Sequence, residues 1–351
     1  MHILLVRFSS MGDVVLQTAT VNWLRSLFGA ELKLSFATSR EFASLLTSHP
    51  GIDNVISFDR RGEEGFDGFL TKLRKMHKFE RFDLIIDLHA TLRSLRLRTF
   101  FWRVPALTVD KRRIERFLLT KVKSVTFRKL FRHRSLGMEP QVERILKDLE
   151  TIFGDTIARR RTEDYRKGPN RELTSLPKPQ AFPLPGPYIV LAPSASFLYK
   201  RWPVTSFVKL ARELLEATGH HVVVLAGPDD KFCEAFGEIQ SERLLNLQGK
   251  TTLAQSMSVL SGALLCIGND SGMNHISEAY GVPCVTIFGP TDPAFGFAPH
   301  GERSVYLSKD LWCKPCSTTG KSTCYRDRHY CMELVSVPEV KDAALRILEG
   351  A

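Results

Sequence analysis

Short apolar runs alternate with amphipathic stretches along most of the chain. In the first half, apolar runs predict strands at residues 3–8, 32–37, 54–58 and 83–88, and helix-like periodicity predicts helices at 13–28, 40–48 and 66–78. In the second half we expect strands at 188–192, 221–225, 263–267 and 284–288, with helices at 204–218, 231–239, 253–261, 272–280 and 337–349. This alternation predicts parallel sheets covered by helices on both faces.

Six prolines between residues 167 and 187 interrupt the alternation. They predict a semi-rigid linker at 171–187. We therefore expect an N-terminal Rossmann-like domain at 1–170 and a C-terminal one at 188–351, with a last helix that stays in the second domain or crosses back to the first. The strand ends of the two sheets are expected to face a central cleft, where ligands of open α/β sheets bind.

The composition, 43% hydrophobic and 25% charged residues over 351 positions, is that of an ordinary globular protein. No apolar run approaches the roughly 20 residues that span a bilayer. The first residues are typical of a strand and lack the features of a signal peptide. We expect a cytoplasmic protein whose seven cysteines are mostly reduced.

The net charge of +11 is concentrated in residues 93–134, which hold fourteen Lys and Arg against two acidic residues. Such a segment predicts a polyanionic partner: a phosphorylated glycolipid, an anionic membrane surface or nucleic acid. Apolar residues interleave with the charges, which favours a helix that touches lipid. A solvated basic face remains the alternative.

Three motifs are absent from the sequence. There is no G-x-G-x-x-G and no G-x-x-x-x-G-K-[ST], which argues against dinucleotide and P-loop sites. There is also no D-x-D pair to hold a divalent ion on a sugar nucleotide. We therefore expect chemistry that requires neither a cofactor nor a catalytic metal.

The turn after the first strand carries Ser10, Gly12 and Asp13. A glycine permits close approach of a substrate, and the helix dipole keeps a carboxylate at its N-terminus ionised. Asp13 could therefore take a proton from an attacking hydroxyl. A plain helix cap is the alternative.

The loops after the strands of the second half supply groups that suit a diphosphate. Amides at a helix start attract phosphate, a lysine can neutralise a leaving anion, and a carboxylate can bind a ribose. A helix cap with a core histidine is the alternative for the segment at 270–275. The candidate donor-site residues are Ser194, Ser196, Lys200, Asp230, Asp270, Ser271, Gly272, His275 and Thr291.

Two further groups are weaker candidates. Arg60, Arg61 and Arg93 follow strands of the first half and could contact acceptor phosphates, although each alone could be a solvated charge. Four thiols, at Cys313, Cys316, Cys324 and Cys331, could hold a structural zinc, pair as disulfides or stay free.

Four motifs together resemble glycosyltransferase family 9, the bacterial lipopolysaccharide heptosyltransferases: SSMGD at 9–13, KRWP at 200–203, DSGMNHI at 270–276 and FGPTDP at 288–293. The resemblance implies a GT-B fold and ADP-L-glycero-D-manno-heptose as donor. It also implies the Kdo–lipid A inner core as acceptor, inversion at the anomeric carbon without a metal, and work at the cytoplasmic face of the inner membrane with no nucleic acid partner.

The same resemblance assigns roles to residues. It implies that Asp13 is the catalytic carboxylate, Lys200 a donor-site cation, Asp230 the nucleoside contact, and the segment from Asp270 to Gly272, with His275, the phosphate site. Ala195 and Ser196 stand where the family pattern has two threonines. The cysteine-rich C-terminal stretch is similar to heptosyltransferase II-like members. A transferase of the same fold with another nucleotide sugar, or a non-catalytic polyanion-binding protein, remains the alternative.

Overall fold

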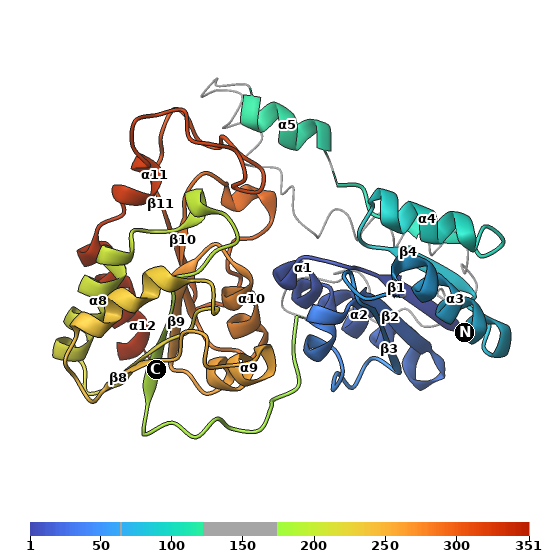
Figure 1. Cartoon of the computed structure of the whole chain (residues 1–351), viewed down its shortest axis with the longest axis horizontal. Coiled ribbons are helices and arrows are strands. Elements are labelled where there is room, and N and C mark those ends of the chain that lie inside the picture. Colours follow the sequence, from blue (N-terminus) through green and yellow to red (C-terminus); the bar gives the residue numbers. More distant parts are fainter. Residues whose placement is uncertain (64, 112, 122–173, 351) are drawn as a thin grey trace. The chain divides into compact units, whose positions relative to one another are not determined.

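The computed structural model describes residues 1–63, 65–111, 113–121 and 174–350. These residues form two compact units (Figure 1). The first contains the described residues up to 111 together with 174–177, and the second contains 113–121 and 178–350. Both units are α/β structures with a parallel sheet, which confirms the predicted fold class.

The sheet of the first unit has the strand order β3-β2-β1-β4-β5. Its strands are β1 (His2–Val6), β2 (Lys33–Ser39), β3 (Asn54–Phe58), β4 (Leu84–Asp87) and β5 (Ala106–Thr108). Its helices are α1 (Met11–Leu16), α2 (Thr18–Phe28), α3 (Gly65–Phe79) and α4 (Leu92–Phe100), with the 3-10 turns η1 (Gly29–Glu31) and η2 (Arg40–Leu45). Every residue of β1 is buried, as expected for a central strand.

The sheet of the second unit has the order β11-β10-β9-β6-β7-β8. Its strands are β6 (Tyr188–Ala192), β7 (His221–Val224), β8 (Leu244–Asn246), β9 (Leu265–Asn269), β10 (Cys284–Phe288) and β11 (Val305–Ser308). Its helices are α8 (Val204–Ala217), α9 (Leu253–Ser261), α10 (Gly272–Ala279), α11 (Tyr330–Glu333) and α12 (Val337–Glu349), with the 3-10 segments η5 (Leu198–Lys200), η6 (Lys231–Glu238) and η7 (Pro293–Phe295).

Two helices of the second unit bear on the predicted domain division, which left open only the place of the last helix. The last helix, α12, stays there, because its buried residues join those of α8 in one core cluster, and Figure 1 shows the two helices together on one side of the sheet. Helix α5 (Arg113–Lys121) also belongs to this unit, although the sequence placed it in the first domain. Leu119 packs on Phe295, and a guanidinium nitrogen of Arg116 donates to the Phe295 carbonyl at 3.1 Å.

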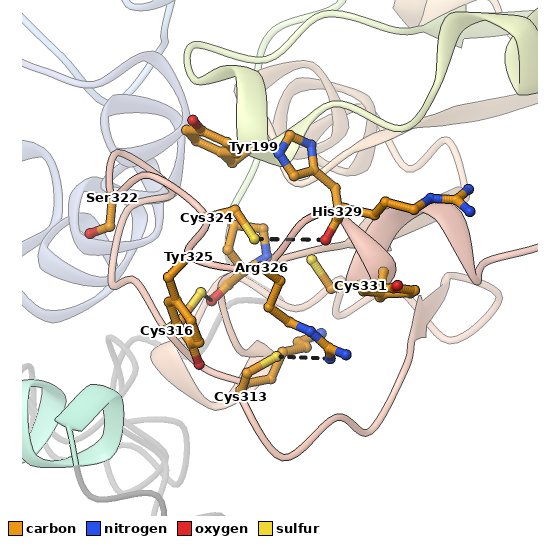
Figure 2. Close-up of a pocket in the computed structure, with 13 residues that line it drawn as sticks. Tyr199, Cys313, Cys316, Ser322, Cys324, Tyr325, Arg326, His329 and Cys331 are labelled. Carbon is orange, nitrogen blue, oxygen red and sulfur yellow. Dashed lines mark hydrogen bonds between the residues drawn. The ribbon is translucent and has the colours of Figure 1, made fainter.

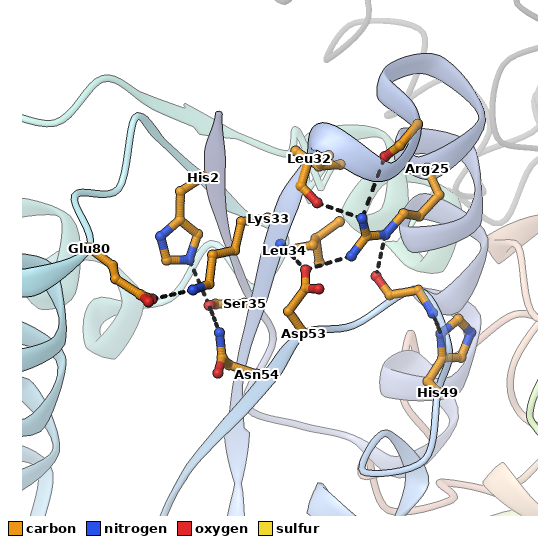
Figure 3. Close-up of polar contacts among 12 residues, drawn as sticks. His2, Arg25, Leu32, Lys33, Leu34, Ser35, His49, Asp53, Asn54 and Glu80 are labelled. Atoms are coloured by element: carbon orange, nitrogen blue, oxygen red, sulfur yellow. Dashed lines mark hydrogen bonds and ion pairs between the residues drawn. The ribbon is translucent and has the colours of Figure 1, made fainter.

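The amino ends of the first sheet are held by a charged network far from the strand ends that bear the candidate site (Figure 3). The Arg25 guanidinium reaches the Leu32 carbonyl at 2.5 Å and the Asp53 carboxylate at 2.5 Å. The same carboxylate accepts from the Leu34 amide at 2.6 Å. Since Asp53 precedes β3 and Leu34 lies in β2, this arginine fixes where two neighbouring strands begin.

The structure corrects several element predictions. The helix expected at 13–28 begins at Met11 and breaks at Gln17 into α1 and α2. The helices expected at 40–48 and 231–239 are the 3-10 segments η2 and η6. The short strands β5, β8 and β11 were not predicted, because edge strands of three or four residues that are partly exposed show little apolar pattern.

Candidate functional site

In the first unit, Asp13 lies in the first turn of α1, at the carboxyl edge of the sheet. Its Oδ2 accepts from the Ser10 amide at 3.1 Å and from the Ser10 hydroxyl at 2.8 Å. The Arg7 guanidinium lies 2.6 Å from the same oxygen. Ser10 is the N-cap of α1, and Asp13 completes its capping box from the third helical position. The ion pair with Arg7 is not required for that role.

The electrostatics of this pair keep Asp13 ionised. Burial works to raise the pKa of Asp13, but the Arg7 guanidinium and the two bonds from Ser10 outweigh it and lower the pKa to about 2. Arg7 is itself 9% exposed and donates to the Leu88 carbonyl at 2.6 Å. The carboxylate is thus a fixed anion at any physiological pH.

A neutral histidine lies at the same edge. Burial, and then the charges of Arg7 and Lys111, lower the pKa of His89 to about 3. Its Nδ1 accepts from the Phe8 amide at 3.4 Å, so the proton of the neutral ring is assigned to Nε2. His89 follows β4, the strand beside β1. The first sheet therefore brings an anion, cations and a neutral N–H donor to one edge.

The predicted acceptor residues fall in different surroundings. Ser10 binds Asp13, and Gly12 lies buried within α1 with no left-handed φ, so it does not form the turn that was expected of it. Arg93 lies over the Phe58 ring, 5.5 Å from its centroid, and its charge acts on His89. Arg60 faces Glu41 at 3.5 Å as an exposed pair.

Arg61 is the last of the predicted acceptor residues. Its side chain is exposed, and its amide donates to the Asp59 carboxylate at 2.9 Å. Arg93 is the predicted arginine that lies in the same region as Asp13, because the charges of both residues affect the pKa of His89.

In the second unit, Asn269 holds two loops together at the end of β9. Its Nδ2 donates to the Pro193 carbonyl at 2.6 Å, and its Oδ1 accepts from the Trp202 amide at 2.9 Å. The segment between Pro193 and Trp202 is thereby fixed beside the loop that starts at Asp270. Since β10, β9, β6 and β7 are neighbours and parallel, their following loops meet at one edge.

The first cluster at this edge centres on Asp270. Its Oδ2 lies 2.7 Å from the Lys200 Nζ and accepts from the Thr291 hydroxyl at 2.8 Å. The side chains of Lys200 and Asp270 are 15% and 6% exposed. Three predicted donor residues from three different loops are thus in direct contact.

The second cluster centres on Asp230. Its Oδ2 accepts from the Ser194 hydroxyl at 2.6 Å and from the Gly227 amide at 2.9 Å, and its Oδ1 lies 3.4 Å from the Arg201 guanidinium. Ser196, by contrast, is exposed. The loops after β6 and β7 are joined by this carboxylate.

The start of α10 carries the remaining predicted donor residues. Ser271 is its N-cap and Gly272 its first residue. The Ser271 Oγ is buried and has no hydrogen-bond partner among the described residues. His275 lies one turn later, 5% exposed, and lines the same pocket as Ser271 and Asp270. An orphaned hydroxyl at a helix N-terminus is suited to an anionic ligand.

The four cysteines Cys313, Cys316, Cys324 and Cys331 line one small cavity of about 20 Å³ (Figure 2). Of these, Cys324 and Cys331 carry free thiols. Burial, with a further contribution from the other thiols, raises the pKa of Cys331 to about 11. Within the described ranges, no group of three or more His, Cys, Asp or Glu side chains is arranged to hold a metal ion. The zinc hypothesis stays a prediction.

The basic segment at 93–134 is described only up to residue 121, with a gap at 112; its remainder lies outside the described residues. In α4 the exposed residues recur at helical spacing and include Leu92, Leu95, Arg96 and Phe100. Trp102, just after α4, is 74% exposed. The described helices include none that is long and apolar enough to cross a bilayer.

Sequence reasoning missed three residues that build these edges: Arg7, His89 and Asn269. Each is the last residue of a strand or lies one or two positions beyond it, in β1, β4 and β9. Polar residues at the carboxyl ends of buried parallel strands are therefore the signal that could have found them.

The comparisons with known proteins agree with one another. A family model described as "Glycosyltransferase family 9 (heptosyltransferase)" matches residues 70–325. Lipopolysaccharide heptosyltransferase 1 of Pseudomonas aeruginosa is 25% identical over 334 residues, which cover 92% of this chain and 87% of that protein.

Two solved structures share the whole fold. Escherichia coli ADP-heptose lps heptosyltransferase II covers all of both chains with a TM-score of 0.69 at 18% identity. The E. coli heptosyltransferase WaaC, with ADP-2-deoxy-2-fluoro heptose, also covers all of both chains, with a TM-score of 0.64 at 20% identity. This likeness identifies the fold as GT-B.

Proposed function

This chain belongs to glycosyltransferase family 9, and we propose that it transfers heptose from ADP-L-glycero-D-manno-heptose to the Kdo–lipid A inner core of lipopolysaccharide. The names of the two E. coli structures, one with ADP-heptose and the other with ADP-2-deoxy-2-fluoro heptose, support this donor. The observation that carries the proposal is the edge of the second sheet, where Lys200, Thr291 and the unpartnered Ser271 hydroxyl surround the start of α10.

The donor diphosphate would bind at this edge. Lys200 supplies a cation, the Ser271 Oγ a free donor, and the α10 amides a positive helix end. Asp270 balances the Lys200 charge at 2.7 Å. When a donor phosphate binds, Lys200 would exchange this carboxylate for the phosphate as its anionic partner. Asp230, already fixed by Ser194 and Arg201, is placed to accept from the ribose hydroxyls.

The transfer we propose is a single displacement with inversion. An acceptor hydroxyl attacks the anomeric carbon, its proton passes to an oxygen of Asp13, and the bond from the anomeric carbon to the diphosphate breaks, releasing ADP. Lys200 neutralises the charge that develops on the departing diphosphate, as a metal does elsewhere. Because the pKa of Asp13 is about 2, the carboxylate is in its proton-accepting form throughout the physiological range.

The acceptor side of the proposal rests on the first unit. Arg7, Arg93 and Lys111 all act electrostatically on His89, and such a group of cations suits a phosphorylated acceptor. The exposed apolar and basic face of α4 supports peripheral contact with an anionic membrane surface, and hence work at the cytoplasmic face of the inner membrane. A heptosyltransferase II-like acceptor specificity stays a prediction.

The test is transfer by the purified chain, with ADP-heptose and Kdo–lipid A as substrates. We expect a product heavier by one heptose in mass spectrometry and an inverted anomeric configuration in its NMR spectrum. Transfer from UDP- or GDP-hexoses but not from ADP-heptose would show that the proposed donor is wrong. Binding of lipopolysaccharide with no transfer from any nucleotide sugar would favour the polyanion-binding alternative.

A further inference from the structure

The cysteine-rich segment (residues 309–329) packs directly on the candidate donor site. Its buried Lys314 donates to the Phe288 carbonyl at 3.2 Å, and the amides of Cys316 and Ser317 donate to the Pro290 carbonyl at 3.1 and 3.3 Å. Phe288 and Pro290 flank the start of the loop that carries Thr291. The segment is therefore attached to the donor-site loop after β10 by its own backbone.

The segment also meets the loop after β6, on which Lys200 lies. The rings of His329 and Tyr199 stack edge to face with centroids 4.7 Å apart, and Figure 2 shows both beside the cysteines. Gly320 makes the closest contact. A Cβ on this residue would lie 2.4 Å from Cγ and 2.5 Å from Cδ of Lys200.

Gly320 is buried and fixed in place. Its amide donates to the Ser317 hydroxyl at 2.8 Å, and its φ of +83° is in the region that favours glycine. The Lys200 atoms that such a Cβ would meet are in the stem of the side chain, so we expect them to shift and to carry Nζ with them. With Gly320 against its stem, the Lys200 side chain places Nζ 2.7 Å from the Asp270 carboxylate.

We propose that the cysteine-rich segment is a positioning element of the donor site, and that the absence of a side chain at Gly320 places the Lys200 ammonium for the donor diphosphate. This inference rests on the proposed function of Lys200. Gly320 contacts no substrate in this account; it acts through Lys200.

The experiment compares Gly320→Ala with Gly281→Ala. Gly281 has a similar φ of +75°, but its Cβ would meet nothing within 4 Å, so this variant reproduces the backbone strain without the contact. We expect Gly320→Ala to raise the donor KM and weaken ADP binding by about tenfold, the scale of one hydrogen bond to a charged group, with the acceptor KM unchanged. Gly281→Ala should keep both values.

A double-mutant cycle shows whether the effect passes through Lys200. In a Lys200→Ala background, which removes the stem, Gly320→Ala should weaken ADP binding no further. An equal loss in both backgrounds, or a donor KM equal to that of Gly281→Ala, would overturn the proposal. If Gly320→Ala does not fold, Ser317→Ala takes its place, because it removes the hydroxyl that holds the Gly320 amide. An unchanged donor KM in Ser317→Ala would also contradict the proposal.

The failures of the two proposals are distinguishable. If Lys200→Ala itself binds ADP as the wild type does, the donor site of the proposed function is wrong. If Lys200→Ala weakens ADP binding and Gly320→Ala does not, the donor site stands and the positioning role of Gly320 is wrong.

Discussion

The aspartates at the C-terminal ends of the strands have different partners in the two sheets. At the first edge, Asp13 faces Arg7 and a neutral His89. At the second, Asp270 and Asp230 each join a cation and a hydroxyl from neighbouring loops. An ionised carboxylate such as Asp13 suits proton transfer, whereas a cation such as Lys200 at a helix N-terminus suits an anionic leaving group. One kind of sheet thus supports two chemistries through the residues that follow its strands.

The comparison is tested most severely by Asp13→Asn. The amide cannot accept the acceptor proton, so we expect kcat to fall about 10²–10⁴-fold, the usual contribution of a positioned base. The ADP affinity, measured by calorimetry, should stay near that of the wild type. Asp67→Asn, an exposed carboxylate of α3, is the matched control and should keep full activity. Transfer within a few-fold of wild type would remove Asp13 from the mechanism.

The second prediction concerns Arg7, which distinguishes this edge from the other. In Arg7→Leu, burial is opposed only by the two bonds from Ser10, so the pKa of Asp13 should rise from about 2 toward its usual value. We expect about a 10²-fold loss of kcat at neutral pH from misplacement of the carboxylate. The pH profile of kcat/KM should also gain an acid limb that the wild type lacks. An unchanged profile would mean that Arg7 does not control this ionisation.

The same pair affects stability with a definite sign. The pKa of Asp13 is lowered on folding, so its contribution is complete above the unfolded value of 3.8 and is lost as the pH falls through about 2. It amounts to about 2 kcal/mol at most. Unfolding by denaturant should therefore show a steeper acid loss of stability in the wild type than in Asp13→Asn.

The buried strands and the short motifs beside them are the features that the sequence could predict. Strands such as β1 and β9 are predictable because every residue is buried, and Asp13, Lys200 and Asp270 are predictable because they occupy short motifs beside such strands. Helix α4 was harder, since its exposed face carries leucines and a phenylalanine and so blurs the helical period.

Contacts between residues distant in sequence could not be predicted at all. The approach of Gly320 to Lys200 and the bonds of Asn269 to Pro193 and Trp202 depend on how loops return to the sheet edge. Nothing in the local pattern around residue 320 marks that glycine as different from other turn glycines. The sequence predicts which loops bear chemistry, and packing decides which neighbours hold those side chains.

The next prediction separates acceptor binding from donor binding. In α4 and just after it, reversing Arg96 and Arg103 to Glu should weaken binding to anionic liposomes by about thirtyfold or more, because each basic residue near the surface contributes roughly 1 kcal/mol. The acceptor KM should rise while the donor KM stays the same, because the candidate donor loops belong to the other unit. Arg212→Glu, an exposed arginine of that unit, is the control. If liposome binding and acceptor KM both persist, α4 presents only a solvated basic face.

The smallest expected effect is that of removing metal ions. We expect transfer to continue in excess EDTA, because the sequence has no D-x-D pair and Lys200 supplies the charge that a divalent ion would bring to the diphosphate. Loss of activity that Mg²⁺ or Mn²⁺ restores would contradict this. A slow loss of activity that zinc alone restores would instead implicate the four thiols that line one cavity. In that case zinc should no longer restore activity to Cys324→Ser. Since three of those thiols belong to the segment that carries Gly320, the donor KM should then rise before kcat falls.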